Sequence, residues 1–201
     1  HKAGVYNLPE LAEYLGLSLR EAQDRIEELA ELSDLFTFDA KTAKFVTQKS
    51  YLPLAKNRIE AALPDAIEGR FVIGTKMITD STNSDVLDLT PQDSPAIAVA
   101  EMQRSGRVRR SKSWLSPLAK NLYFSMRFTF KKAAIQDLSA LSIWVGLAAL
   151  DLLREMGIEA VKMKWPNDLW VHEQKIAGIL VESLPVAEGI TTIIGIGINN
   201  H

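Results

Sequence analysis

The chain has 201 residues, 47% of them hydrophobic, and a formal net charge of −2. This length and composition predict one sizeable core with room for a small extra domain. The chain has no cysteine, which excludes a disulfide framework, a thiolate metal site and a cysteine nucleophile within these residues. It has no apolar run of about 18 residues and no secretory pattern at its start. We therefore expect a cytoplasmic protein that does not contact a membrane.

The first part of the chain has the pattern of two helices. Apolar positions at helical spacing predict one helix over residues 8–15 and a second over 19–32, separated by a turn at Gly16. Ser18 and Glu21 have the spacing of a capping box at the start of the second helix. We therefore expect two helices joined by a tight turn.

A hairpin is predicted next, with strands at 35–38 and 44–47. Helix, turn, helix and hairpin is the order of a winged helix-turn-helix module, which we assign to residues 1–50. The first helix of such a module would precede His1. We therefore expect a chain that is truncated at this end.

The charge of the second helix bears on what this module binds. The helix carries two basic and five acidic residues, a net charge of −3. DNA binding draws on Lys and Arg at phosphates, so this helix disfavours a DNA operator as partner unless the hairpin lysines outweigh it. Those lysines are Lys41, Lys44 and Lys49. The alternative is a module for protein contact or scaffolding.

Residues 51–69 predict a linker with a helix over 54–63, and residues 70–201 form the main domain. In this domain strands outnumber helices and the last turns are short, which favours an α+β fold with a mixed, largely antiparallel sheet and helices on one face. The predicted strands are 71–78, 96–101, 121–130, 161–165, 169–171 and 176–184. The predicted helices are 83–89 and 135–156, the second ending at Gly157.

One segment, residues 164–182, reads KWPNDLWVHEQKIAGILVE and places polar residues where strands end. Pro166 fixes its own φ, and Asn167 and Asp168 can close a turn with their side chains. Three further segments carry polar or glycine-rich patterns: TDSTN at 79–83, QRSGRVRRSKSW at 103–114 and GIGIN at 195–199. The four segments together mark candidate site residues.

In this order, the four segments resemble the motifs of the biotin protein ligases, over roughly residues 70–200. The resemblance implies a class II synthetase-like catalytic domain that forms biotinyl-5′-AMP from biotin and ATP. Such an enzyme then transfers biotin to a lysine of the biotin carrier domain of a carboxylase. The resemblance also implies Mg²⁺ with the ATP, a homodimer and, in some members, repression of biotin synthesis. We expect the family's small C-terminal β domain to be missing from this sequence, whose last residue is His201.

A basic loop fits this chemistry, because a carboxylate and a phosphate approach each other only when cations neutralise both. Five cations lie within nine residues: Arg104, Arg107, Arg109, Arg110 and Lys112. By resemblance, Arg107 and Arg109 bind the biotin carboxylate, the adenylate and pyrophosphate, and Arg110 adds to the nucleotide site. The loop departs from the family pattern at Val108 and Ser111, where glycines would stand. Since Val resists positive φ, we expect a stiffer loop and altered retention of the adenylate.

Lys175 is the strongest catalytic candidate, together with Arg109. By resemblance, Lys175 contacts the biotin carboxylate and the α-phosphate and stabilises the charge that develops there. Asp168 is expected to hold Mg²⁺ or to accept a proton from the carrier lysine; the alternative is a turn residue. Lys164 is expected to add positive potential at the phosphates, and Trp165 is expected to pack.

The uncharged biotin ring needs short hydrogen-bonding groups in an apolar pocket. By resemblance, its binding residues are Ser81, Thr82, Asn83, Gln103, Arg107 and Gly178. Ser81 and Thr82 are also candidates to cap the helix that follows. The remaining residues assigned to the nucleotide are Trp114, Asn167 and Asn199, with a place in the core as the alternative for Trp114. The glycines of the last strands would make room for a ligand or mark a bulge.

Two rival functions stay open. One is a biotin-responsive transcriptional repressor with weak or no ligase activity, for which Val108 gives a reason. The other is a lipoate-handling ligase of the same fold, against which the Arg-rich loop and the KWPND turn argue. The sequence has no P-loop, and its three histidines are too scattered to form a metal cluster.

Overall fold

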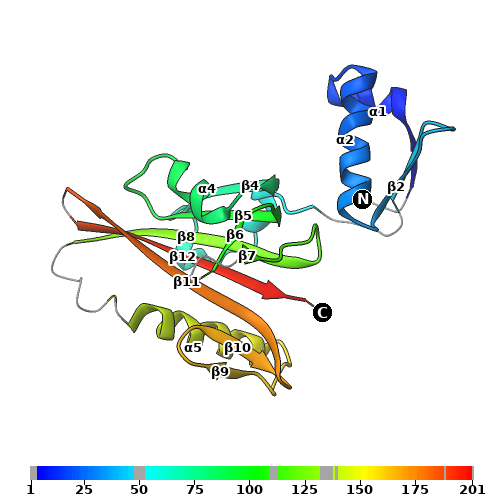
Figure 1. Ribbon diagram of the computed structural model, residues 1–201. Helices are drawn as coiled ribbons and strands as arrows, with labels where there is room; N and C mark the ends of the chain where they lie inside the picture. Colours follow the sequence, from blue (N-terminus) through cyan, green and yellow to red (C-terminus); the bar gives the residue numbers. More distant parts are fainter. Residues whose placement is uncertain are drawn as a thin grey trace. The chain divides into compact units, whose positions relative to one another are not determined.

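The computed structural model describes residues 4–47, 53–108, 113–131, 138, 140–187 and 189–200. The chain divides into two compact units, His1–Pro53 and Leu54–His201 (Figure 1). Among the described residues, no helix combines the length and apolar character needed to cross a membrane. Each unit has its own elements and core.

The first unit contains the two predicted helices and the predicted hairpin. Its elements are β1 (Val5–Asn7), α1 (Leu8–Leu15), α2 (Leu19–Leu32), β2 (Phe36–Asp39) and β3 (Lys44–Thr47). The capping box is confirmed, because the side chains of Ser18 and Glu21 each accept from the other's backbone N–H. Gly16 ends α1 in the left-handed conformation, with φ 65°. Strand β1 was not predicted, since its three residues lack a strand pattern; it pairs with β3.

The second unit carries the remaining elements. They are α3 (Lys56–Glu60), the 3₁₀ turn η1 (Asp65–Ile67), β4 (Val72–Thr79), α4 (Thr82–Asp88), β5 (Ala96–Gln103), β6 (Gly106–Arg107), β7 (Ser113–Trp114), β8 (Asn121–Lys131), α5 (Leu141–Glu155), β9 (Lys162–Lys164), β10 (Asp168–Val171), β11 (Gln174–Val186) and β12 (Gly189–Asn199). Helix α3 is shorter than the predicted 54–63, because its end tightens into three-residue hydrogen bonds before Pro64.

Seven strands form one sheet, in the order β4-β5-β8-β12-β11-β10-β9. The β4–β5 pair is parallel, and every other neighbouring pair is antiparallel. The predicted α+β fold with a mixed, largely antiparallel sheet is therefore confirmed. A separate two-stranded ribbon pairs β6 with β7. This ribbon flanks the basic loop, whose residues 109–112 lie outside the described part of the chain.

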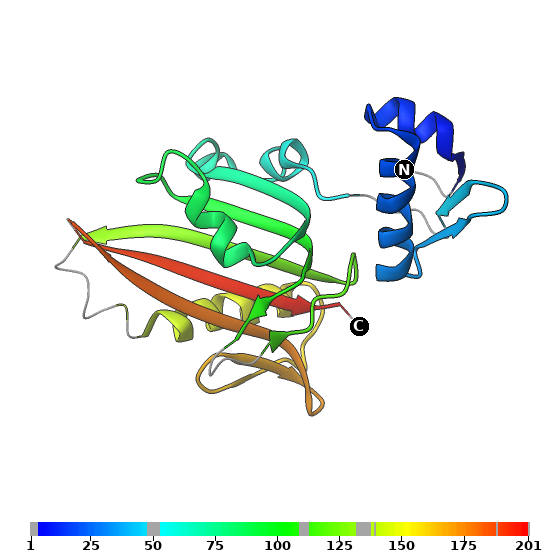
Figure 2. The same ribbon diagram turned by 45° about the horizontal axis from the view of Figure 1, so that its top comes forward.

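The two main helices lie on opposite faces of the sheet, which corrects the expectation that helices share one face (Figures 1 and 2). On β12, Ile193 packs with Val86 of α4, whereas Ile194 packs with Ile179 and with Val145 of α5. Neighbouring side chains of a strand point to opposite faces. The central strands are therefore apolar on both sides, and their sequence pattern does not show which face a given helix covers.

Helix α5 is predicted over 135–156 and described over Leu141–Glu155. Residues 135–137 and 139 lie outside the described residues. Gly157 follows the helix with φ 93°, so the predicted glycine stop is confirmed. The helix packs over β9, β10 and β11 through a cluster of apolar residues: Leu150, Leu153, Val161, Leu169 and Ala177.

A buried arginine holds the far end of α4. The side chain of Arg127 on β8 is 1% exposed and donates to backbone carbonyls at the end of α4 and in the following turn, namely Val86, Leu87, Leu89, Pro91 and Ser94. The last carbonyls of a helix lack partners within the helix. Arg127 satisfies them, and it thereby fixes where α4 lies on the sheet. Burial lowers the pKa of Arg127.

Candidate active site

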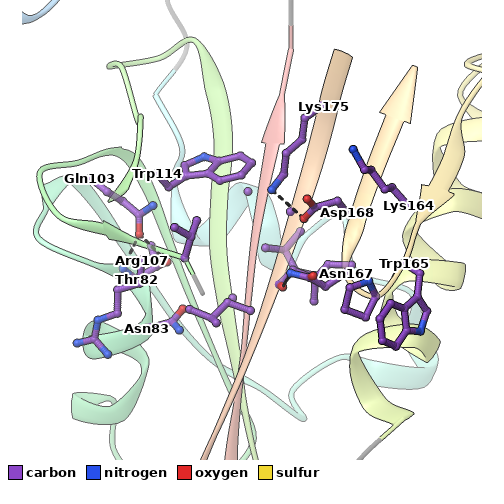
Figure 3. Close-up of a pocket in the computed structure, with 18 residues that line it drawn as sticks. Thr82, Asn83, Gln103, Arg107, Trp114, Lys164, Trp165, Asn167, Asp168 and Lys175 are labelled. Atoms are coloured by element: carbon purple, nitrogen blue, oxygen red, sulfur yellow. Dashed lines mark hydrogen bonds and ion pairs between the residues drawn. The ribbon is translucent and has the colours of Figure 1, made fainter. Parts of the chain in front are cut away.

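The candidate site is a cavity of about 720 Å³ on the face of the sheet that α4 covers (Figure 3). A cavity of this size suits a small-molecule ligand. Its lining residues come from α4, from the strand ends of β5, β6 and β7, and from β9 to β12. They are Thr82, Asn83, Gln103, Arg107, Val108, Trp114, Lys164, Trp165, Pro166, Asn167, Asp168, Lys175, Gly178, Ile179, Leu180, Gly195, Ile196 and Gly197.

Glycines form the floor of the cavity, and side chains of the site lie directly on them. A Cβ at Gly197 would meet the Trp114 ring at 2.7 Å, and one at Gly178 would meet Trp114 at 2.7 Å and Lys175 Nζ at 3.0 Å. A Cβ at Gly195 would overlap Asn83 Oδ1. The glycines are therefore needed to seat Trp114, Lys175 and Asn83 close to the sheet.

A β-bulge turns Lys175 into the cavity. In the β10–β11 pair, Leu169 faces Ala177 but Trp170 faces Lys175, so Ile176 has no partner on β10. Ile176 packs beside Ala177 in the cluster under α5. In a regular ladder, a residue three positions before Gly178 would point to the opposite face. The extra residue moves Lys175 to the same face as Gly178, as bulges beside functional sites often do.

Lys175 forms an ion pair with Asp168, with 2.7 Å between Nζ and Oδ1. The two side chains are 31% and 25% exposed, so the pair lies at the cavity wall and is open to ligands. Figure 3 shows both groups directed into the cavity from β10 and β11. The Lys175 Nζ also lies 4.9 Å from the centre of the Trp114 ring, in a cation–π contact. The sequence-predicted lysine and carboxylate therefore meet.

The KWPND turn is held on β11 by Asn167. Its Nδ2 donates to the carbonyl of Ile179 at 2.7 Å, and its own carbonyl accepts from the Ile179 N–H at 2.9 Å. Lys164 lies 3.8 Å above the Trp170 ring, at the same wall of the cavity. Trp165 is 79% exposed, so the expectation that it packs is wrong; the turn directs its ring outwards at the rim.

The opposite wall is built from buried polar groups. Gln103 Oε1 accepts from the Thr82 N–H at 2.9 Å and lies 3.0 Å from Thr82 Oγ1. Thr82 Oγ1 lies 2.7 Å from Ser125 Oγ, and Ser125 donates to Asn83 Oδ1 at 2.6 Å. Ser81 stands at the N-cap of α4 without a side-chain cap bond, is buried, and does not line the cavity.

Arg107 lies at this polar wall, away from Lys175 (Figure 3). Its Nη2 donates to Ser84 Oγ at 2.6 Å, and its Nη1 lies 3.4 Å from Glu182 Oε2. Arg107 and Lys175 thus contribute cations at different places along the cavity. Val108 lines the cavity. The predicted residues Arg109 and Arg110, like Ser111, lie outside the described residues.

A second cavity of about 700 Å³ adjoins the first at Trp114 and Lys175, which line both. Asn199 lies in this second cavity, where its Nδ2 donates to the Lys175 carbonyl at 2.9 Å and its Oδ1 accepts from Asn121 Nδ2 at 3.2 Å. Trp114 is therefore neither a plain core residue nor fully exposed. It separates two neighbouring hollows, each able to hold part of a two-part ligand.

Tyr123 lies beside this boundary, on the same face of the sheet as Gly197. It faces Gly197 in the β8–β12 pair and donates to the Pro117 carbonyl at 3.2 Å. Burial raises the pKa of Tyr123 to about 12. The phenol therefore stays neutral and holds the segment that follows Trp114.

Two contributors to the site escaped sequence reasoning. Ser125 links Thr82 to Asn83, and Glu182 accepts from Asn83 Nδ2 at 2.6 Å. Glu182 is the last residue of the KIAGILVE motif, so the motif marks it as a candidate. Its hydrogen-bond partners could not be predicted, because they lie far away in the sequence. Ser125 lies in a strand whose pattern carries no mark of a site.

Comparison with known proteins agrees with this architecture. The sequence profile of the Biotin/lipoate A/B protein ligase family matches residues 74–199. The bifunctional ligase/repressor BirA of Salmonella typhimurium is 33% identical over 193 residues, which cover 94% of this chain and 58% of that protein. The chain therefore spans little more than half the length of this relative.

Two solved structures share the fold. The biotin protein ligase from Aquifex aeolicus in complex with biotin and ATP has a TM-score of 0.53 and 30% identity, covering 64% of this chain and 52% of that one. The biotin protein ligase from Leishmania major in complex with biotinyl-5-AMP has a TM-score of 0.53 and 26% identity, covering 64% and 57%. With its profile match across the site-bearing sheet, this chain belongs to the Biotin/lipoate A/B protein ligase family.

Proposed function

We propose that this protein is a biotin protein ligase, which joins biotin to AMP and then transfers biotin to a lysine of a biotin carrier domain. The observation that carries the proposal is one cavity with two chemically different walls. Buried hydroxyl and amide groups line one wall, and the Lys175–Asp168 pair lines the other. A ligand with an uncharged polar ring and a carboxylate fits this arrangement.

The polar wall suits the ureido ring of biotin, which offers two N–H donors and a carbonyl acceptor. Thr82 and Asn83 are 3% and 4% exposed, so a matching ligand meets groups that are already desolvated. A site of this kind rejects a ligand that leaves its polar groups unpaired. The dithiolane ring of lipoate has no N–H or carbonyl group, so this wall favours biotin over lipoate.

The charged wall suits the activation of the carboxylate. A carboxylate oxygen of biotin attacks the α-phosphorus of ATP, the bond to the β-phosphate oxygen breaks, and pyrophosphate leaves. Lys175 would lie beside both anions, and a positioned cation stabilises charge that develops during such a displacement. Asn199 and Trp114, at the adjoining cavity, would contact the nucleoside, with Arg109 and Arg110 of the basic loop completing the phosphate site.

Mg²⁺ would supply positive charge at the phosphates of ATP, and a residue of the cavity would help to hold it. Among the described residues there is no group of three or more His, Asp or Glu side chains that could hold a metal ion. Mg²⁺ is commonly bound by one or two carboxylates together with substrate phosphates, and Asp168 is the acidic residue among those lining the cavity. The donor set therefore fits a metal ion shared with ATP.

In the second step, the amine of the carrier lysine attacks the carbonyl of biotinyl-AMP. AMP leaves, and the attacking nitrogen loses a proton. Asp168 can accept this proton, because its carboxylate projects into the cavity beside Lys175 (Figure 3). The exposed ring of Trp165 at the rim would lie where an incoming protein substrate meets the cavity.

The direct test mixes the protein with biotin, ATP labelled at the α-phosphate and a purified biotin carrier domain. Labelled biotinyl-AMP, followed by biotin on the carrier lysine, is the expected result. Adenylate without transfer would favour the biotin-responsive regulator. Adenylation of lipoate in preference to biotin would assign the rival substrate, and no adenylate with either acid would overturn the proposal.

The first unit has the element order of a winged helix-turn-helix module, and we assign it that fold. Helix α2 carries a net charge of −3, which opposes binding to DNA phosphates. Lys41 and Lys44, which lie in the hairpin, are described cations that could offset this negative charge. Titration of labelled operator-like DNA at two salt concentrations, with and without biotin and ATP, tests repression; binding would show that the hairpin outweighs α2.

A homodimer through a sheet edge also remains a proposal. The seven-stranded sheet ends at β4 on one side and at β9 on the other, and edge strands offer unpaired backbone groups to another chain. Sedimentation velocity with and without biotin and ATP measures the association. A single monomeric species under both conditions would contradict the dimer.

A further inference from the structure

Glu182 stands behind the polar wall of the cavity without lining it. Its Oε2 accepts from Asn83 Nδ2 at 2.6 Å, and both carboxylate oxygens lie within 3.5 Å of Arg107 Nη1. Its side chain is 33% exposed. Glu182 therefore connects α4, the β6 ribbon and β11, and it touches two residues assigned to the ligand.

The carboxylate decides which way the Asn83 amide faces. The oxygen and nitrogen of an amide have nearly the same shape, and their positions follow from the hydrogen bonds around them. An ionised carboxylate only accepts, so Asn83 must direct its NH₂ group to Glu182. Its Oδ1 then faces Ser125 Oγ at 2.6 Å.

The direction of the next hydrogen bonds follows from counting protons. A hydroxyl has one proton to donate. Ser125 donates its proton to Asn83 Oδ1, because an amide oxygen can only accept. The 2.7 Å contact between Thr82 Oγ1 and Ser125 Oγ is therefore donated by Thr82. The other acceptor of the Thr82 hydroxyl is Gln103 Oε1, which lies 3.0 Å from Thr82 Oγ1 and also accepts from the Thr82 N–H at 2.9 Å. Both acceptors lie inside the protein, so the hydroxyl proton is directed away from the cavity.

The consequence is a fixed polarity at the cavity surface. The Thr82 hydroxyl donates its one proton to an acceptor inside the protein. Towards a ligand, its oxygen can therefore only accept a hydrogen bond. We propose that Glu182 is a positioning residue that sets this polarity through Asn83, Ser125 and Thr82, and so selects ligands that present an N–H group at Thr82. The inference rests on the proposed biotin function, since the ureido group supplies that donor.

Two variants of Glu182 separate the hydrogen bond from the charge. Glu182→Met has a similar length but no acceptor, so the Asn83 amide can turn and the hydroxyl protons can reverse. Glu182→Gln removes the charge but keeps an oxygen that can accept from Asn83. Glu155→Met, an exposed carboxylate at the end of α5, is the matched control outside the cavity.

The assay is biotin-dependent exchange of pyrophosphate into ATP, with biotin and with an analogue whose ring oxygens replace both ureido N–H groups. The measured quantity is the ratio of kcat/KM for biotin to kcat/KM for the analogue. We expect Glu182→Met to lower this ratio about tenfold, the effect of one hydrogen bond. Glu182→Gln should keep most of the ratio, and Glu155→Met should keep all of it.

The possible results test the role of Glu182 separately from the proposed biotin ligase function. If the unaltered protein shows no exchange with biotin, the proposed function fails. If it shows exchange and Glu182→Met leaves the ratio unchanged, the polarity role of Glu182 is overturned, even if the variant is less stable. An equal loss of ratio in Glu182→Gln and Glu182→Met would assign the effect to charge on Arg107 and would also overturn it.

Discussion

The two walls of the cavity differ in how their polar groups are satisfied. At the polar wall, Thr82 and Asn83 of α4 are almost fully buried and are bonded to partners on β5, β8 and β11. At the charged wall, Lys175 and Asp168 are about a quarter to a third exposed and pair with each other. A preformed polar wall suits the part of the ligand that does not change during the reaction. A partly exposed ion pair can exchange partners and so can stabilise charge that develops during the reaction.

Removing the ammonium group breaks the charged wall and has the largest expected effect. Lys175→Ala should lower adenylate formation by about 100- to 1000-fold, the usual cost of losing one preorganised stabilising group. Pyrophosphate exchange measures the rate. Lys162→Ala, an exposed lysine of β9 outside the cavity lining, is the control; equal activity of both variants would remove Lys175 from the mechanism.

Neutralising the carboxylate separates the two chemical steps. Asp168→Asn keeps the side-chain shape, but a neutral amide is a poorer ligand for Mg²⁺ than a carboxylate, so adenylate formation from ATP should also fall. Transfer to the carrier should fall about 100-fold if Asp168 accepts the proton. Single-turnover transfer from preformed biotinyl-AMP measures this step. Unchanged transfer would restrict Asp168 to holding Lys175 and the metal ion.

Removing a hydroxyl tests the polar wall alone. Thr82→Val should raise the KM for biotin about tenfold and leave the KM for ATP unchanged, because a buried hydrogen-bonding group is lost. Thr75→Val on β4, which does not line the cavity, is the matched control. A parallel rise in both KM values would show that the two walls are not independent.

The smallest effect is expected at Lys164, which adds charge from a position above Trp170. Lys164→Met should raise the KM for ATP by roughly two- to fivefold, the range of an exposed cation interaction. The KM for biotin should not change. Because such interactions are screened by salt, the difference from the unaltered protein should shrink as ionic strength rises.

Local patterns predicted much of the fold. The capping box at Ser18, the glycine stop at Gly157 and the strands on either side of the KWPND turn depend on neighbouring residues, and the structure contains them. The arrangement of helices on two faces was not predictable in this way. When a strand is apolar on both sides, its sequence pattern does not indicate which helix covers which face.

In the candidate site, too, the residues within motifs were predictable from the sequence, and contacts between distant residues were not. Lys175, Asp168, Thr82 and Gln103 come together as the motifs indicate. The partners of Arg107 were not foreseen, because Glu182 is 75 residues away in the sequence. Trp165 was misjudged, since a Trp is usually buried on average and nothing in the turn sequence shows its ring at a rim.

The bulge at Ile176 makes the relative length of β10 and β11 matter for the chemistry. Inserting one residue between Leu169 and Trp170 would give Ile176 a partner and would restore a regular ladder, with every proposed catalytic and ligand-binding group still in the chain. Lys175, three positions before Gly178, would then point towards the apolar cluster under α5, formed by Leu169 and Ala177 among others. The cavity would lack its ammonium group although no proposed site residue had been replaced. For these two strands, the match between their lengths matters as much as the identity of their residues.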